Sequence, residues 1–270
     1  MRAAGALLVL MLVLTAPADS WARERIDPPA LRLLFVGNSL VYVGNLPAVF
    51  DALARRNGRS VQSDMLVKGG ATLSDRLADG SVERALGSAE YDRVILQERG
   101  GDFLCAFGSD SCQRAANSLQ RLAGMVRDRG SMPLLLGTYQ GSPRASREIV
   151  EAESAAAAAL GIPYVSISNR LQAGMQAAPS SRWLHADRMH PGHELVLLEA
   201  IALYRTLFGE SPKNGALRVL APMHEPDAHF PAAVVSDTFL PDPATRGPRS
   251  YTYPAAEVRL ALAIAGRNPD

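Results

Sequence analysis

The sequence has no excess of charge of either sign, because its 28 Lys and Arg side chains nearly balance its 27 Asp and Glu side chains. A net charge of +1 excludes the strongly basic surface that contacts phosphates in nucleic-acid-binding proteins. The charged residues are also spread along the chain, which disfavours an acidic or basic interaction tail. We therefore expect no nucleic-acid partner.

Long apolar runs are missing except near the N-terminus, where an apolar stretch over residues 6–15 follows Arg2 and precedes small residues. This stretch is shorter than the roughly 20 residues that span a membrane, and the pattern is that of a secretory signal peptide. We expect residues 1–22 to be cleaved before Arg23, with a site at 16–18 as the alternative. The mature protein is then periplasmic or secreted and has no stable membrane span. An uncleaved anchor helix is the other possibility.

Cysteine is scarce, and the only two, Cys105 and Cys112, are separated by six residues. In an oxidising compartment we expect them to form a disulfide that closes a short loop. Two free thiols are the alternative, because sequence does not prove connectivity. The chain also lacks H-E-x-x-H and paired-cysteine spacings, so we expect neither a metal nor another cofactor.

What the sequence does contain is an alternation of strand-like and helix-like segments. Strands are predicted at 31–36, 61–67, 92–97, 132–138 and 163–168, and helices at 46–57, 72–86, 113–129, 145–160 and 192–207. Such alternation predicts right-handed βαβ units and a five-stranded parallel sheet, in a flavodoxin-like, three-layer αβα fold. The length of 270 residues suits one such domain, which we place at residues 23–209.

Residues 210–270 have a different composition, with frequent prolines and little periodicity before the apolar stretch 258–265. We interpret this segment as a Pro-rich C-terminal extension that packs on the core, not as a second domain. A lid over the site is a further possibility for it. His224 and His229 are expected to be solvated loop residues.

Two short motifs carry the candidate chemistry. Ser39 directly follows the first predicted strand within the sequence GNSL, and the pair Asp187 and His190 comes just before the helix at 192–207. Together they provide the nucleophile, base and orienting carboxylate of a nucleophilic hydrolase. Taken alone, Ser39 could equally be a turn or helix-capping serine.

The order and context of these motifs resemble the SGNH (GDSL-like) hydrolase family over residues 31–209. The block Asp187–His190 matches the family's D-x-x-H pattern, whereas the first block has Asn38 where the family name has Asp. The resemblance implies a catalytic triad of Ser39, Asp187 and His190 in a serine ester hydrolase. It also implies an oxyanion hole.

For that oxyanion hole the resemblance implies backbone donors at Ser39 and Gly70 and an asparagine side chain after the third strand. No Asn stands there, and we expect Gln97 to supply the amide, with Asp102 as the alternative aligned residue. Independently of the family, Ser39, Gly70 and Gln97 follow the ends of three parallel strands, where ligands bind in open sheets. The loops 98–112 and 139–147 are expected to shape the pocket.

Other kinds of site chemistry have less support in the sequence. His185, His190 and His193 surround Asp187 and could suggest zinc, but their spacing matches no known zinc motif. Glu98 and Asp102 could form a carboxylate pair for glycoside chemistry, which nothing in their spacing favours. The sequence thus predicts an exported serine esterase acting on small, acetyl-type esters, with a small-molecule or carbohydrate ester as substrate. An O-acyltransferase and a non-catalytic carbohydrate-binding or scaffold domain are the alternatives.

Overall fold

A computed structural model describes residues 30–240 and 248–266 of the chain. Its centre is a six-stranded sheet in the order β5-β4-β3-β1-β2-β7. The strands are β1 (Leu31–Gly37), β2 (Val61–Val67), β3 (Arg93–Leu96), β4 (Met132–Leu136), β5 (Tyr164–Val165) and β7 (Val235–Ser236). The first five pair in parallel, so the predicted parallel sheet is confirmed, whereas β7 adds an unpredicted antiparallel strand beside β2.

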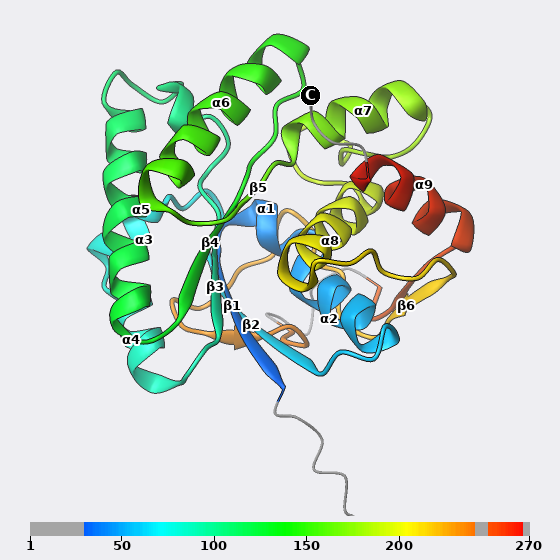
Figure 1. Cartoon of the computed structure of the whole chain (residues 1–270), viewed down its shortest axis with the longest axis horizontal. Coiled ribbons are helices and arrows are strands. Elements are labelled where there is room, and N and C mark those ends of the chain that lie inside the picture. The colour runs from blue at the N-terminus through cyan, green and yellow to red at the C-terminus, as the bar shows by residue number, and fades with distance from the viewer. Residues whose placement is uncertain (1–29, 241–247, 267–270) are drawn as a thin grey trace, which may run out of the picture.

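Helices cover both faces of this sheet and complete three layers, which confirms the predicted αβα fold (Figure 1). The helices are α1 (Ser39–Tyr42), α2 (Leu46–Arg56), α3 (Leu73–Ala78), α4 (Ser81–Ser88), α5 (Ser111–Asp128), α6 (Pro143–Leu160), α7 (Ser168–Ala177), α8 (His193–Phe208) and α9 (Ala255–Ala265), with a 3-10 turn η1 (Asp102–Leu104). Helices α3 to α6 lie on one face, and α2, α8 and α9 lie on the other.

The sheet is buried on both faces because its strands are almost wholly apolar. In β1, Leu33 and Phe35 face the core under α2 and α8, whereas Leu34 and Val36 face the core under α3 to α6. All four side chains are fully buried. A near-continuous apolar strand of this kind is typical of a parallel sheet with helices on both sides.

The single helix expected at 72–86 is wrong in detail, because the chain forms α3 and α4 with a break between them. Gly80 lies at the break with φ +67, a left-handed conformation that a helix interior does not accommodate. Three helices, α1, α7 and α9, were not predicted, although α9 contains the apolar stretch noted at 258–265. The first is only four residues long and the second has few strongly apolar positions, so neither has a clear periodic pattern.

The C-terminal segment packs against the rest of the chain. Strands β6 (Leu217–Val219) and β8 (Tyr251–Tyr253) form a separate antiparallel pair. β7 pairs with β2, α9 packs on α8, and the carbonyl of His224 accepts a hydrogen bond from the Gly44 N–H. The expectation that His224 is solvated is wrong, because it is only 2% exposed, and burial lowers the pKa of its imidazole to about 4.

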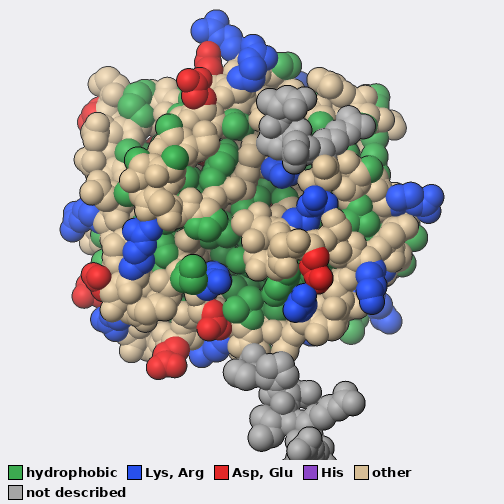
Figure 2. All heavy atoms as spheres, viewed as in Figure 1, with side chains coloured by type: hydrophobic (Ala, Val, Ile, Leu, Met, Phe, Trp, Pro, Cys, Tyr) green, Lys and Arg blue, Asp and Glu red, His purple; other side chains and the backbone are tan. Residues whose placement is uncertain are grey.

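The surface is mixed in charge. Lys and Arg side chains alternate with Asp and Glu on the face seen in Figure 2, with apolar and neutral atoms between them. Among the helices of the described residues, none is long and apolar enough to cross a membrane. The predicted cleavable segment, residues 1–22, lies outside the described residues.

Candidate active site

The candidate nucleophile lies in a tight turn between β1 and α1. β1 ends at Gly37, where an added Cβ would come within 2.7 Å of Val41 Cγ2, so a larger residue there would displace the Val41 side chain. Asn38 caps α1 by accepting a hydrogen bond from the Leu40 N–H at 3.0 Å. This geometry puts Ser39 at the first position of α1, at the carboxyl end of the central strand.

Asn38 also joins this turn to the loop after β2. Its side-chain amide donates a hydrogen bond to the carbonyl oxygen of Ala71 at 3.0 Å, and Asn38 is almost completely buried. Gly70, the neighbour of Ala71, has φ +69, so the loop requires a residue that tolerates the left-handed region. Ser39 and Gly70 are thereby held beside each other by one buried amide.

The second motif forms a compact turn before α8. Asp187 Oδ1 accepts hydrogen bonds from the backbone N–H groups of Met189 and His190, at 2.9 and 3.0 Å. Its other oxygen, Oδ2, lies 2.6 Å from His190 Nδ1. The carboxylate therefore fixes both the backbone and the imidazole of the same turn. In this arrangement Nδ1 carries the hydrogen and Nε2 is free to accept a proton.

The environment of Asp187 favours the carboxylate form. Partial burial works to raise the pKa of Asp187, but hydrogen bonds from the His190 N–H, the His190 imidazole and the Met189 N–H outweigh it. The pKa of Asp187 consequently lies well below its usual range. His185 Nδ1 lies 3.3 Å from the same Oδ2, which adds a second imidazole beside the carboxylate.

Ser39, Gly70 and His190 line one cavity of about 540 Å³. Its walls come from five loops, including both loops expected to shape the pocket, 98–112 and 139–147. Pro226 of the C-terminal segment also lines it, and its carbonyl accepts a hydrogen bond from the Tyr42 hydroxyl. Within residues 30–240 and 248–266, no hydrogen bond joins the Ser39 hydroxyl to the imidazole, as is common in ligand-free sites.

Two backbone donors at the cavity are available to a ligand. The N–H groups of Ser39 and Gly70 have no acceptor among the described residues. Ser39 is the first residue of α1, and the first N–H groups of a helix lack partners within it. Donors of this kind can stabilise a developing oxyanion.

Gln97 is not brought to the cavity with these residues. Its side chain is fully buried, and its amide donates a long hydrogen bond of 3.4 Å to the Gly137 carbonyl at the end of β4. The expected oxyanion role of Gln97 stays a prediction, and this placement does not favour it. Asp102, the alternative residue, forms a two-point ion pair with Arg99 at 2.9 and 3.0 Å and is also buried.

Gly100, Tyr139 and Gln140 line the cavity within the two loops expected to shape it, but the sequence assigned none of them an individual role. The Tyr139 hydroxyl donates to the Met189 carbonyl at 2.9 Å and so supports the turn that carries His190. In the sequence, only their position shortly after β3 and β4 indicated that they lie near the site. Within the described residues, no three His, Cys, Asp or Glu side chains gather as metal ligands would.

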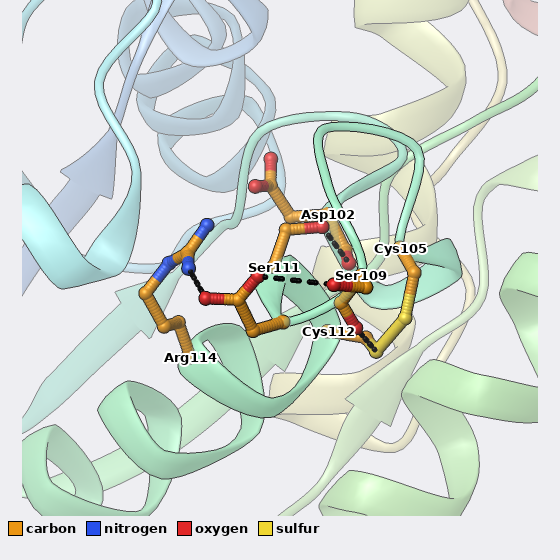
Figure 3. Close-up of a disulfide and its surroundings, with 7 residues drawn as sticks. Asp102, Cys105, Ser109, Ser111, Cys112 and Arg114 are labelled. Carbon is orange, nitrogen blue, oxygen red and sulfur yellow. Dashed lines mark hydrogen bonds and ion pairs between the residues drawn. A yellow bond between two sulfur atoms is a disulfide. The ribbon is translucent and has the colours of Figure 1, made fainter.

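The expected disulfide between Cys105 and Cys112 is present and joins the loop after β3 to the first turn of α5 (Figure 3). Within this loop, Phe107 lines the cavity, and the Arg99 guanidinium lies 3.7 Å from its ring centroid. The disulfide and the cation–π contact together hold this aromatic wall in place.

Glu98 ties two of the loops around the cavity together. Its Oε1 accepts hydrogen bonds from the Leu73 N–H at 3.1 Å, after the Gly70 loop, and from the Arg99 N–H at 2.8 Å. Burial raises the pKa of Glu98 to about 7. Engaged in this way, Glu98 supports the backbone of the site.

Comparisons with known proteins show which solved structures share this fold. No protein-family model matches the sequence, and no curated protein matches it significantly. Among solved structures, a candidate SGNH hydrolase from Slackia heliotrinireducens matches with a TM-score of 0.53 and 26% identity, over 66% of this chain and 100% of that one.

Two further structures share the fold at lower identity. A DUF4886 family protein from Bacteroides uniformis matches with a TM-score of 0.60 and 14% identity, over 88% of this chain and 93% of its own. An acetylxylan esterase from Geobacillus stearothermophilus matches with a TM-score of 0.51 and 14% identity, over 67% and 96%. The fold is therefore that of the SGNH hydrolases, and the structural neighbours support an SGNH-like hydrolase.

Proposed function

We propose that the protein is an exported esterase that hydrolyses small, acetyl-type esters through a triad of Ser39, His190 and Asp187. The observation that carries this proposal is the 2.6 Å contact between Asp187 Oδ2 and His190 Nδ1, beside a cavity that Ser39 and His190 both line. An imidazole held at Nδ1 by a carboxylate presents Nε2 as a base toward a neighbouring serine.

In the proposed reaction, Ser39 Oγ attacks the ester carbonyl carbon while His190 Nε2 accepts the hydroxyl proton. The tetrahedral oxyanion is stabilised by the N–H groups of Ser39 and Gly70. Collapse breaks the bond to the leaving oxygen, to which His190 returns the proton, and the alcohol departs. Water then attacks the acyl-enzyme with His190 again as base, and releases the carboxylic acid and free Ser39.

The cavity supports a short acyl group. Leu40 and Phe107 provide apolar walls beside Gly100, where an added Cβ would lie 3.8 Å from Leu40 Cδ1. Phe107 lies on the disulfide-closed loop and contacts the Arg99 guanidinium, and we propose that this wall limits the length of the acyl chain. Carbohydrate esters are candidate substrates, which the likeness to an acetylxylan esterase supports. The disulfide supports export to an oxidising compartment.

The proposal is tested by assaying purified mature protein and Ser39→Ala on p-nitrophenyl acetate and p-nitrophenyl octanoate at neutral pH. We expect hydrolysis of acetate to exceed that of octanoate and to fall by a factor on the order of 10⁴ in the variant. Turnover that survives the substitution would exclude Ser39 as the nucleophile. A folded protein without turnover of either ester would contradict the esterase proposal.

A further inference from the structure

A second cavity adjoins the candidate active site. Its volume is about 560 Å³, and it shares Gly141, Leu184 and Arg188 with the cavity that Ser39 and His190 line. Trp183 and His185 lie on the walls of the second cavity only. The two cavities therefore adjoin at these three residues, and Arg188 lies on the walls of both.

The walls of this double cleft contain cations but no carboxylate. Neither set of lining residues includes Asp or Glu, whereas Arg99 and Arg188 are both present. Of the acidic groups nearby, Asp187 is bound to His190, and Glu225 lies 3.4 Å from His185 Nε2. Asp227 lies near enough for its charge to raise the pKa of Tyr42, which lines the first cavity. Of the two arginines on these walls, Arg99 is neutralised by its pair with Asp102, and no carboxylate on the walls pairs with Arg188.

The two arginines differ in how they are engaged. The Arg99 guanidinium is paired with Asp102 through two hydrogen bonds and lies over the Phe107 ring. The Arg188 guanidinium has no hydrogen bond or ion pair with any residue that the structure describes. Arg188 is therefore the cation at this cleft that can bind a ligand without breaking an existing pair.

The backbone also places Arg188 at this junction. It is one of three non-glycine residues with positive φ in the described part of the chain, with φ +62. A left-handed arginine is uncommon and costs free energy, so its persistence in a turn beside a catalytic residue suggests a function. Its N–H donates to the His185 carbonyl at 2.9 Å, which holds the turn in this conformation.

The position of Arg188 indicates which part of the substrate it contacts. In the proposed reaction His190 protonates the leaving alcohol, so that alcohol must lie on the His190 side of the scissile bond. Arg188 is two residues from His190 and leads into the second cavity, whereas the apolar walls of Leu40 and Phe107 suit the acyl group.

Resting on the proposed esterase function, we propose that the substrate is an ester of an anionic alcohol, and that Arg188 binds a carboxylate on that leaving group. An O-acetylated uronic acid sugar has this chemistry. Guanidinium groups bind carboxylates through paired hydrogen bonds, and Arg188 is exposed, so a ligand can reach its guanidinium. Arg188 is then the residue that determines specificity for the alcohol, while the triad performs the hydrolysis.

A matched pair of substrates tests this proposal: an O-acetylated methyl glucuronoside and the same compound as its neutral carboxamide. Acetate release is measured for wild type, Arg188→Asn and Arg188→Lys. Asn tolerates the left-handed conformation, so this variant removes the charge while keeping the turn. Arg147→Asn, an exposed arginine on α6 that lines neither cavity, is the matched control.

For the wild type and the Arg147 control, kcat/KM is expected to be about tenfold or more higher for the glucuronoside than for the carboxamide. This ratio should fall to near one in Arg188→Asn, be partly kept in Arg188→Lys, and decrease with added salt. A wild-type ratio near one, or a ratio unchanged in Arg188→Asn, would overturn the proposal. Failure of the esterase function itself is distinguishable, since neither compound nor p-nitrophenyl acetate would then be hydrolysed.

Discussion

Asn38 donates a hydrogen bond from its buried side-chain amide to the carbonyl oxygen of Ala71, at 3.0 Å. Its other side-chain atom, Oδ1, accepts from the Leu40 N–H. An aspartate, the residue of the family's own motif, could keep the second bond but has no N–H for the first. At this position the amide has a role that a carboxylate cannot perform, which is to fix the Gly70 loop against the Ser39 turn.

We therefore expect Asn38→Asp to impair the enzyme, although it restores the family motif. A carboxylate facing the Ala71 carbonyl loses one buried hydrogen bond, and we expect a loss of about 1–3 kcal/mol in the free energy of unfolding. A shift of Gly70 relative to Ser39 should also lower kcat on p-nitrophenyl acetate. Urea denaturation and steady-state kinetics measure the two effects. Asn117→Asp, at an exposed position on α5, is the control. Wild-type stability and kcat in Asn38→Asp would contradict the assigned role.

Removal of the disulfide should affect both stability and acyl-chain selectivity. The bond between Cys105 and Cys112 closes a short loop, for which the chain-entropy model gives roughly 2–3 kcal/mol. The same loop positions Phe107 at the cavity. In the double variant Cys105→Ala, Cys112→Ala we expect a lower urea midpoint and a higher ratio of octanoate to acetate hydrolysis. Wild-type protein with reductant should change in the same direction. An unchanged ratio would show that the loop does not define the acyl pocket.

Stability should decrease with rising pH because of Glu153. Burial raises the pKa of this carboxyl from 4.5 to about 7, although hydrogen bonds from the Thr138 N–H and hydroxyl and from the Tyr164 hydroxyl oppose the shift. The folded state therefore binds the proton more tightly than the unfolded state does. Its stabilisation is fully present below pH 4.5 and is lost as the pH rises to about 7.

The variant Glu153→Gln tests this dependence because its side chain cannot ionise. Relative to wild type, its free energy of unfolding should rise by on the order of 3 kcal/mol between pH 4.5 and pH 7, the value that corresponds to a shift of this size. Urea denaturation at several pH values measures the difference. Glu151→Gln, at an exposed position of the same helix, is the control, and its free energy of unfolding should depend on pH as that of wild type does. The prediction would be contradicted if the free energy of unfolding changed with pH equally in Glu153→Gln and in wild type.

The parts of the fold that the sequence predicted are those with a repeated pattern. β2 was predicted at its observed bounds, and α2 differs from its prediction only in its last residue, because both present several apolar residues at a regular spacing. The two-residue strand β7 has no such pattern, and only its pairing with β2 defines it as a strand. His224 was misjudged for a related reason, since its position depends on residues remote in the sequence, Val43 and Gly44, which pair with its backbone.

The same distinction holds for the candidate site: contacts set by local spacing could be predicted, and those set by remote parts of the chain could not. The contact between Asp187 and His190 could be predicted because three residues of spacing suffice to form it. The direction of Gln97 could not, because it depends on where the end of β4 places the Gly137 carbonyl. Arg188 also gave no signal, since its left-handed backbone follows from the turn that Asp187 and His185 close.

The variant Asp187→Asn tests the triad most directly. The two backbone N–H groups of Met189 and His190 require an oxygen at the Oδ1 position, so the amide NH₂ of Asn would take the place of Oδ2 beside His190 Nδ1. A donor there favours the imidazole tautomer with hydrogen on Nε2, which cannot accept a proton from Ser39. We expect kcat on p-nitrophenyl acetate to fall by about 10²–10⁴, while KM changes little. Glu225→Gln, beside His185 but not in contact with His190, is the control for a general change in charge. If Asp187→Asn kept the wild-type kcat, the imidazole would not depend on this carboxylate, and the base of the reaction would have to be sought elsewhere along the cavity.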